Sequence, residues 1–455
     1  MFGLLKGRLL LTRIMLLAST LALTVIGIVA IYTVGHPASP APVPGSSANE
    51  TGSVVEGGGP ARSFSEAGSK VEGVERTEET DAGGQTSELA NLWKKQLVFG
   101  GLGFAALVLI NLVSYRRFGE ISYGIYAAVL VLLAVLLVDK FIDLHFVSVI
   151  NGARRWLRIP IGAGSLNIQP SEICKPAYVL ALAWYLRYRS NYRSFKALIG
   201  PFILTILPTV LILLEPDLGT VLLMLPVFFV MLFVAGAKVR HLAIMLVIAL
   251  AISPVLWLKM QPYQRLRISS VLLQSDWLRQ KAELHPLLGR MLVGTNFSTK
   301  RWKDDWGYHL IRSKYAVASG GITGYGFGKG PFVKYNFLPE RHNDFIFAVI
   351  AQQWGFAGCI AVLLLYIILL LCGLEIAGAN TDPFGRLLAI GMVASFAIQI
   401  IVNITMTLGL MPITGLTLPF ISYGGSSLMV SMACVGLLNN IGRRRRFTVA
   451  PRAFE

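Results

Sequence analysis

The feature that most constrains this chain is a series of long apolar segments. A helix needs about 20 mostly apolar residues to cross a bilayer, and about ten segments approach or reach that length. They lie at residues 14–34, 96–115, 123–138, 171–187, 197–214, 218–236, 241–258, 344–374, 386–410 and 420–441. The sequence therefore predicts an all-α, polytopic integral membrane protein with about ten transmembrane helices.

Composition agrees with this fold class. Of the 455 residues, 54% are hydrophobic and only 14% are charged, whereas soluble domains contain roughly 25% charged residues. A soluble enzyme, a coiled coil and a disordered scaffold are therefore excluded for most of the chain. The cysteines lie in apolar runs without metal-ligand spacing, so we expect buried packing residues at Cys174, Cys359, Cys372 and Cys434.

The distribution of Lys and Arg among the short loops predicts the orientation, because basic residues concentrate in cytoplasmic loops. They occur in alternate loops, near residues 6–13, 116–117, 187–196, 238–240, 386 and 443–452. Both termini are therefore expected to be cytoplasmic. The run Arg443–Arg446 is better explained as an anchor beside the last span than as a nucleic-acid site.

The chain divides into four parts. Residues 1–34 contain the cytoplasmic N-terminus and first span, residues 91–446 the main transmembrane domain, and residues 447–455 a cytoplasmic tail. Residues 35–90 are rich in Gly, Ser, Pro, Ala and Glu, with nine acidic and three basic residues. That composition predicts a disordered, acidic extracytoplasmic linker that acts as a spacer.

A large outer loop, residues 259–343, carries most of the unexplained positive charge. It contains 14 basic and five acidic residues, and a loop of this length does not determine topology. A basic surface beside the membrane favours an anionic substrate. The alternative is a loop that only contacts anionic lipid headgroups. Within it, Arg265 and Arg267 are placed to bind phosphate.

Ionisable residues within or beside the spans are costly and are usually paired or functional. Glu172 and Lys175 lie three residues apart, on one helical face, which predicts an internal ion pair, a lining for a substrate cavity, or both. Asp217 follows a proline and either caps the next helix or belongs to the site.

Asp344 stands where the basic outer loop meets an apolar helix, which suits acid–base chemistry, although an N-cap is the alternative. The run Ser422–Ser427 pairs glycines with hydroxyls and is typical of close helix packing. Gly320–Gly328 lacks the preceding strand and the Lys-Ser/Thr ending of a nucleotide loop, so we expect a flexible re-entrant or surface segment.

Taken together, these motifs resemble the SEDS family (shape, elongation, division and sporulation), of which RodA and FtsW are members. The resemblance covers residues 100–446. Its motifs are Asn151–Trp156, Gln169–Glu172 with Lys175, Glu215–Thr220, Tyr263–Arg267, Gly307–His309 with Ser313-Lys314, Leu338–Glu340 with His342 and Asp344-Phe345, and Pro412–Ser427. Gly307-Tyr308-His309 leans towards the RodA branch.

The resemblance implies a bacterial inner-membrane glycosyltransferase that polymerises lipid II into peptidoglycan strands on the outer face, in cell shape or division. It implies that the aspartate at Asp344 is essential and that Arg154, Arg155 and Trp156 belong to a functional outer loop. The implied partner is a class B penicillin-binding protein. The chain departs from the family pattern at Gln352-Gln353, where paired glutamates are usual, and in segment 278–306, which looks inserted.

The implied substrate joins a lipid tail to a disaccharide-peptide through pyrophosphate, so the reaction needs no nucleotide cofactor. A divalent cation, Mg²⁺ or Mn²⁺, is compatible with such a substrate, but the metal requirement is unknown. We assign Asp344 as the general base for an inverting transfer. Candidates for the pyrophosphate are Arg154, Arg155, Arg265, Arg267 and Lys314. Further substrate-binding candidates are Trp156, Glu172, Lys175, Asp217, His342 and Ser426.

A transporter that flips lipid-linked precursors is the main alternative, because many spans, interrupted helices and a buried ion pair are also features of transporters. No inverted repeat is visible in the sequence, and an outer basic loop that ends in a carboxylate favours chemistry. A non-catalytic scaffold for a wall synthase would leave the clustered outer polar residues unexplained.

Overall fold

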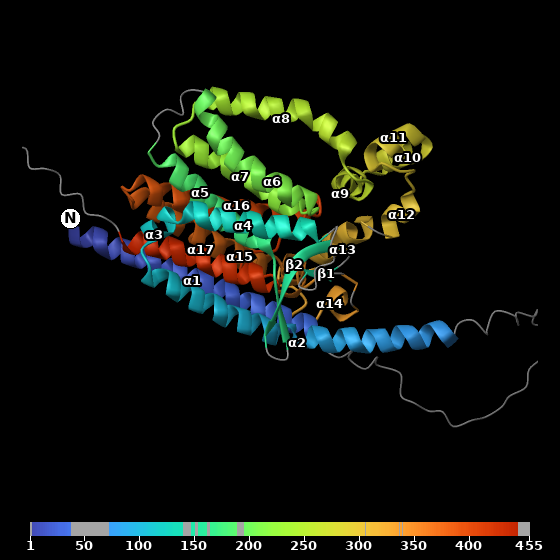
Figure 1. The fold of residues 1–455 in the computed structure, drawn as a ribbon. Helices are drawn as coiled ribbons and strands as arrows, with labels where there is room; N and C mark the ends of the chain where they lie inside the picture. Colours follow the sequence, from blue (N-terminus) through green and yellow to red (C-terminus); the bar gives the residue numbers. More distant parts are fainter. Residues whose placement is uncertain are drawn as a thin grey trace, which may run out of the picture.

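The computed structural model describes residues 2–37, 72–139, 147–150, 153–161, 164–188, 195–304, 306–335, 337–338 and 340–444. All ten predicted apolar segments form helices. They are α1 (Phe2–Gly35), α2 (Glu72–Leu112), α4 (Ser122–Val138), α5 (Pro170–Leu186), α6 (Ile199–Leu214), α7 (Leu218–Val234), α8 (Val239–Lys259), α15 (Ile346–Ala379), α16 (Pro383–Thr407) and α17 (Gly425–Arg443). They make one bundle, except that α8 runs apart from the others over most of its length (Figure 1).

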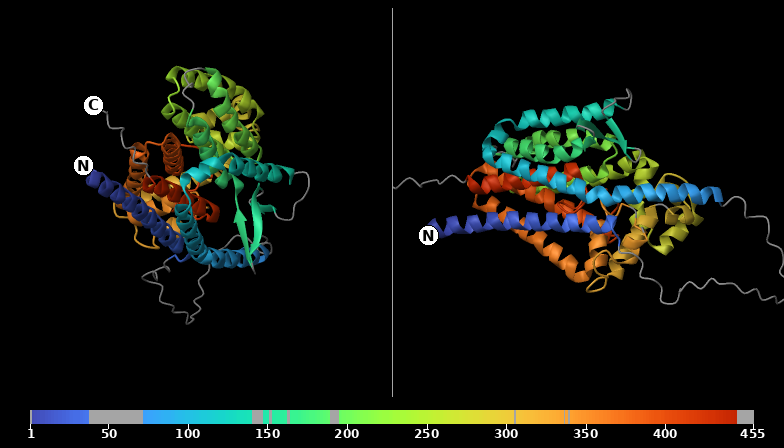
Figure 2. Two further views of the ribbon diagram at one scale, coloured as in Figure 1. Left: turned by 60° about the vertical axis from the view of Figure 1, so that its left-hand side comes forward. Right: turned by 90° about the horizontal axis from the view of Figure 1, so that it is seen from below.

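Seven of these helices have the length and hydropathy to cross a membrane, and α4 and α7 are shorter apolar helices. The remaining helix, α5, carries Glu172 and Lys175 and is also short. The prediction of a polytopic, all-α membrane protein is therefore confirmed. α1 begins and α17 ends at the same end of the bundle, as the orientation argument requires (Figures 1 and 2).

The loops of the large outer segment gather at the opposite end (Figure 2). They contain short helices: α9 (Pro262–Leu272), α10 (Asp276–Leu284), α11 (Pro286–Val293), α12 (Thr299–Asp304), α13 (Trp306–Ser319) and α14 (Pro331–Lys334). Two further short elements, α3 (Tyr115–Glu120) and a 3₁₀ helix at Phe195–Leu198, lie at the other end. The expected insertion is therefore a folded part of the outer loop.

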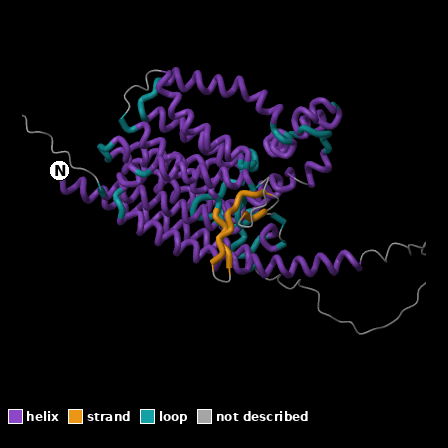
Figure 3. Tube along the Cα trace, viewed as in Figure 1, coloured by secondary structure: helices purple, strands orange, loops and turns teal. Residues whose placement is uncertain are grey.

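A small antiparallel sheet also stands at this outer end, in the order β1 (Val147–Ile150), β2 (Ala153–Ile161) and β3 (Gly164–Ile168) (Figure 3). The sequence predicted only a loop at residues 139–170. The alternation of polar and apolar residues in β2 is short and interrupted by Pro160, which is why the strand signal is weak.

The prediction that residues 35–90 form a disordered linker is partly wrong. Residues 38–71 lie outside the described residues, but α2 begins at Glu72, so residues 72–90 are helical. Glu and Ala favour helix, and a helix that is already formed in a span extends cooperatively. α2 consequently projects beyond the bundle at its outer end (Figure 1).

Close helix contact holds the centre of the bundle together. α17 packs along α2, and a Cβ at Gly436 would lie only 3.1 Å from the Cα of Leu107. Small residues permit such approach in membranes, where no water drives apolar surfaces together. At the end of this contact the fully buried Asn440 amide donates to the carbonyls of Ile110 and Val113, at 2.6 and 2.5 Å. These carbonyls at the end of α2 are thereby satisfied.

The segment Gly320–Gly328 packs against a break in α15. Gly355 has φ +63° and interrupts the helix. Four backbone hydrogen bonds join the two segments: Tyr325 N to Gln352 O, Gly326 N to Gln353 O, Phe356 N to Gly321 O and Ala357 N to Ile322 O. The glycine run therefore satisfies backbone groups that the broken helix leaves without intrahelical partners.

Two of the glycines in this segment, Gly321 and Gly324, provide a matched test. Gly321 and Gly324 both have positive φ, but a Cβ at Gly324 would lie 2.2 Å from the Gln353 carbonyl oxygen, whereas nothing lies within 4 Å at Gly321. Both alanine variants carry backbone strain of about 1 kcal/mol or more. We expect Gly324→Ala to lower the thermal unfolding midpoint clearly more than Gly321→Ala. Equal shifts would show that the docking contact contributes nothing.

Candidate active site at the outer end of the bundle

Asp344 lies in the turn that leads into α15, and the rest of the chain holds this turn by its backbone. The carbonyls of three successive residues, 342–344, accept hydrogen bonds from the Tyr423 N–H, the Ser422 hydroxyl and the Asn403 amide. The distances are 2.9, 2.7 and 3.0 Å respectively. The position of the Asp344 backbone is therefore fixed by α16 and by the segment before α17.

The capping alternative for Asp344 is wrong. α15 has Phe345 as its N-cap residue, and no side chain makes a capping hydrogen bond there. The carboxylate instead faces Gly415, where an added Cβ would lie 3.7 Å from Asp344 Oδ2 and 3.6 Å from Arg267 Nη2. The glycine thus leaves open the space between a carboxylate and a guanidinium.

The surroundings of Asp344 raise the pKa of its carboxyl to about 7. Burial is the largest cause, and the negative charges of Glu340 and Asp217 add to it, while Arg267 acts in the opposite direction. Burial also lowers the pKa of Arg267, although its guanidinium stays charged at neutral pH. A carboxyl that titrates near the working pH is well suited to accept a proton.

Asp217 is the N-cap residue of α7, as the capping interpretation predicted. Its carboxylate accepts hydrogen bonds from the Thr220 N–H and hydroxyl and from the Ser171 hydroxyl, at 3.3, 2.9 and 3.0 Å. A longer bond of 3.4 Å comes from the Gln169 amide. This side chain therefore joins the start of α7 to the start of α5, while its charge acts on Asp344.

The arginines predicted to bind pyrophosphate separate in the structure. On β2, Arg154 forms an ion pair with Asp139 at 3.0 Å, at the end of α4. Arg155 donates to the Pro216 carbonyl at 2.5 Å and lies close enough to Arg267 to lower the pKa of that guanidinium. Arg155 therefore belongs to the group around Asp344, and Arg154 supports the sheet.

Arg265 and Arg267 point to different neighbours, because residues two apart on a helix do not share a face. Arg265 donates to the Leu258 carbonyl of α8 at 2.6 Å, and Arg267 faces Asp344. Lys314 on α13 donates to the Gln274 side chain at 2.9 Å. Of the pyrophosphate candidates, only Arg267 and Arg155 are therefore grouped with the carboxylate.

His342 and Ser426 stand at the margin of this group, and no contact of Trp156 with it is seen among the described residues. The Trp156 side chain on β2 is partly exposed. The His342 ring lies against Tyr423, with ring centroids 5.8 Å apart. The Ser426 hydroxyl accepts from the Gln169 N–H at 3.2 Å and donates to the Asn167 carbonyl at 3.1 Å. Ser426 therefore links the start of α17 to the sheet.

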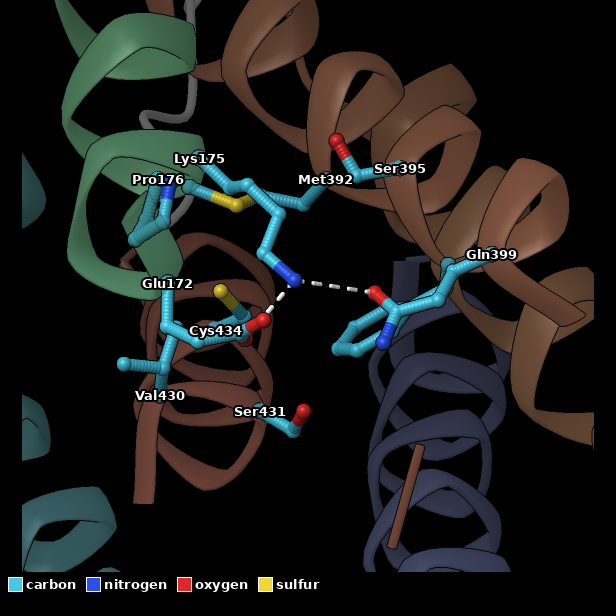
Figure 4. Close-up of a pocket in the computed structure, with 10 residues that line it drawn as sticks. Glu172, Lys175, Pro176, Met392, Ser395, Gln399, Val430, Ser431 and Cys434 are labelled. Carbon is cyan, nitrogen blue, oxygen red and sulfur yellow. Dashed lines mark hydrogen bonds and ion pairs between the residues drawn. The ribbon is translucent and has the colours of Figure 1, made fainter. Parts of the chain in front are cut away.

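Glu172 and Lys175 form the predicted ion pair, with 2.7 Å between Nζ and Oε2, and Lys175 also reaches Gln399 at 3.5 Å (Figure 4). Both side chains are buried between α5, α16 and α17. The cavity beside them encloses about 20 Å³, room for about one water molecule. A volume of this size does not hold a saccharide, so the pair joins helices in this structure.

Among the described residues, no three His, Cys, Asp or Glu side chains are grouped so that they could hold a metal ion. All four cysteines are free and buried, as expected of packing residues.

Comparison with known proteins identifies the family. The model of the FtsW, RodA and SpoVE family, described as cell cycle protein, matches residues 77–447. This chain belongs to that family.

Curated relatives agree with the family assignment. Peptidoglycan glycosyltransferase RodA of Treponema pallidum is 32% identical over 77% of this chain and 89% of its own length. Stage V sporulation protein E of Bacillus subtilis is 36% identical over 78% and 87%. Peptidoglycan glycosyltransferase MrdB of Escherichia coli K12 is 34% identical over 76% and 85%. These identities are too similar to assign the chain to one branch of the family, so membership of the RodA branch stays a prediction.

Two solved structures share the fold. One comes from a study of polymerization and crosslinking by a peptidoglycan synthase complex, with a TM-score of 0.60, 33% identity, and 77% of this chain and 89% of that chain covered. The other is the crystal structure of Thermus thermophilus rod shape determining protein RodA, with a TM-score of 0.56, 27% identity, and coverage of 94% and 96%.

Sequence reasoning did not single out two residues of the candidate site. Asn403 is fully buried in α16, where it bonds the carbonyls of Asp344 and Leu416, at 3.0 and 2.7 Å. A lone asparagine in an apolar helix is itself a signal. Gly415, with φ +76°, lies within the motif Pro412–Ser427, but its place between Asp344 and Arg267 depends on side chains distant in the sequence.

The raised pKa of Asp344 predicts a stability effect. Folding raises this pKa from about 4 to about 7. The free energy of unfolding of the wild type therefore falls as pH rises from about 4 to about 7, and above pH 7 it falls no further on this account. Asp344→Asn removes the titration. We expect the variant to have a higher thermal midpoint than the wild type at pH 8 and a similar one at pH 4. A difference independent of pH would contradict the raised pKa.

Proposed function

We propose that this protein polymerises lipid II into peptidoglycan glycan strands at the end of the bundle where Asp344 lies. The observation that carries the proposal is the facing pair of Asp344 and Arg267 across Gly415, in a chain of this family. Relatives named peptidoglycan glycosyltransferase support the reaction class. The protein is accordingly a membrane-embedded glycosyltransferase.

The geometry suits an inverting transfer. Asp344, with a pKa of about 7, takes the proton of the acceptor sugar hydroxyl as that oxygen attacks the anomeric carbon of the donor. The bond from that carbon to the pyrophosphate oxygen breaks, and the lipid pyrophosphate leaves as an anion. Arg267 and Arg155 lie near enough to stabilise that charge. No nucleotide takes part, because the pyrophosphate already activates the sugar.

A divalent cation would fit this site only with help from the substrate. Since no three suitable side chains are grouped in the described part of the chain, Mg²⁺ or Mn²⁺ would complete its shell with pyrophosphate oxygens and water beside Asp344 and Asp217. An ion held in this way would neutralise charge on the leaving group.

The orientation and the partner follow from the same proposal. Both termini lie in the bacterial cytoplasm, so the Asp344 end faces outwards, where the strand is built. The partner is a class B penicillin-binding protein that cross-links the strands. Support comes from a solved relative whose title describes coordination of polymerization and crosslinking within one complex.

Flipping of lipid-linked precursors is the competing function, and the buried ion pair of Glu172 and Lys175 is its best support. The small cavity there does not provide a pathway in this structure. Purified protein in detergent, given lipid II, separates the two functions. Glycan polymer formed without a bilayer supports the polymerase function. A folded preparation that forms no polymer supports transport.

The rate should depend on Asp344 in two ways. Asp344→Asn keeps the shape but cannot take a proton, and general-base contributions are about 10²–10⁴-fold. We expect Asp344→Asn and Asp344→Ala to bind lipid II but to polymerise it at least about a hundredfold more slowly. The wild-type rate should rise with pH up to about 7 and then level off. A near-normal Asn variant would refute the general-base role.

The two arginines of α9 form a matched pair. Arg267→Gln removes a cation that faces the site, whereas Arg265→Gln removes a contact to α8. Removing one donor to a developing anion costs about 10²–10³-fold in rate. We expect a loss of that order from Arg267→Gln and less than about tenfold from Arg265→Gln. Equal losses would show that α9 contributes only through its packing.

A further inference from the structure

Helices α10 and α11 form a hairpin with an apolar outer face. Its inner side packs around Ala282, Val293 and Trp302. Four large side chains on the outside are 62–83% exposed: Trp277, Leu284, Leu287 and Met291. Trp277 and Leu284 are seven residues apart and Leu287 and Met291 four, so each pair lies on one helical face. A set of large apolar residues this exposed indicates a surface that meets something apolar.

The hairpin is fixed to the outer end of a lipid-facing span. The Trp257 Nε1–H of α8 donates to the Met291 carbonyl at 2.8 Å. Just after α11, a Cβ at Gly294 would lie 3.3 Å from the Cα of Pro262, the first residue of α9. α11 is therefore held against both α8 and α9, and α10 and α11 lie directly beyond the end of α8 (Figure 1).

α8 itself shows what this surface meets. Only His241 is buried along the whole helix, and apolar residues up to its last turn, among them Val255 and Leu258, are more than half exposed. In a membrane protein, such residues contact lipid tails. Leu287 and Met291 continue that lipid-facing surface outwards.

Basic side chains surround the apolar face of the hairpin. Lys259, Lys281 and Arg290 are exposed around the apolar face, and the Lys281 ammonium lies 4.1 Å from the centroid of the Trp277 ring. Tryptophan and long basic side chains beside an apolar face are typical of helices in the membrane interface, where the amine reaches the headgroups and the stem stays apolar.

We propose that the α10–α11 hairpin is an interfacial anchor that inserts its apolar face into the lipid leaflet at this end of the bundle. Interfacial helices bury their apolar face about 5–10 Å deep. The occupant is the lipid surface, because the face is continuous with that of α8. If the proposed function holds, the anchor keeps α9, and so Arg267, at the depth of the phosphate groups of a lipid-linked substrate.

Spin labels test the insertion without any catalytic readout, so failure of the proposed reaction would not affect the result. Labels are placed on Leu287→Cys and Met291→Cys in purified protein in lipid nanodiscs; the four native cysteines are buried. Leu250→Cys on α8 provides the lipid-facing control, and Lys329→Cys, exposed in the outer loop, provides the aqueous control. Collision with oxygen, which enters lipid, is compared with collision with a water-soluble nickel chelate.

Insertion predicts that both hairpin labels have a higher oxygen-to-nickel accessibility ratio than Lys329→Cys, shifted towards that of Leu250→Cys. A ratio equal to that of Lys329→Cys in lipid nanodiscs, with no partner protein present, would overturn the proposal. The apolar face would then lie in water and not in the lipid leaflet.

Discussion

A bilayer core offers no water to backbone N–H and C=O groups, and this constraint governs the whole structure. Regular helices meet it by themselves. At three places in the described part of the chain where the backbone departs from helix, a side chain or another segment supplies the missing partners. At the Gly355 break the glycine segment supplies them, at the start of α7 Asp217 does, and at residues 342–344 Asn403, Ser422 and Tyr423 do. The last two of these departures form the candidate site, so the requirement to satisfy the backbone also positions the chemistry.

Electrostatics then sets what this position can do. Asp344 shares its surroundings with two other carboxylates, Glu340 and Asp217, and with Arg267. Four hydrogen bonds hold the Asp217 carboxylate in its place as the cap of α7. The charge of Asp217 raises the pKa of the Asp344 carboxyl. Two carboxylates in one site thereby acquire different roles, one structural and one able to take a proton.

The sequence predicted the spans well because each depends on local composition alone. It also predicted the Asp217 cap and the Glu172–Lys175 ion pair, since charges beside apolar runs are rare and conspicuous. It did not separate Arg265 from Arg267 or Arg154 from Arg155. Those distinctions depend on the side of the helix or strand from which each arginine projects. They also depend on neighbours in other elements, such as Leu258 and Asp139. The helical start of α2 was missed because acidic, Gly-containing sequence also fits a linker.

The pair Gln352-Gln353 shows how a departure from the family pattern fits this fold. Both side chains are buried in α15. The Thr33 hydroxyl of α1 donates to the Ala30 carbonyl at 2.7 Å, so its oxygen is left to accept. The Gln353 amide donates to it at 2.9 Å. An ionised glutamate has no proton to give and would pay a large desolvation cost there. The neutral amide therefore suits the α1–α15 contact and places no charge in it.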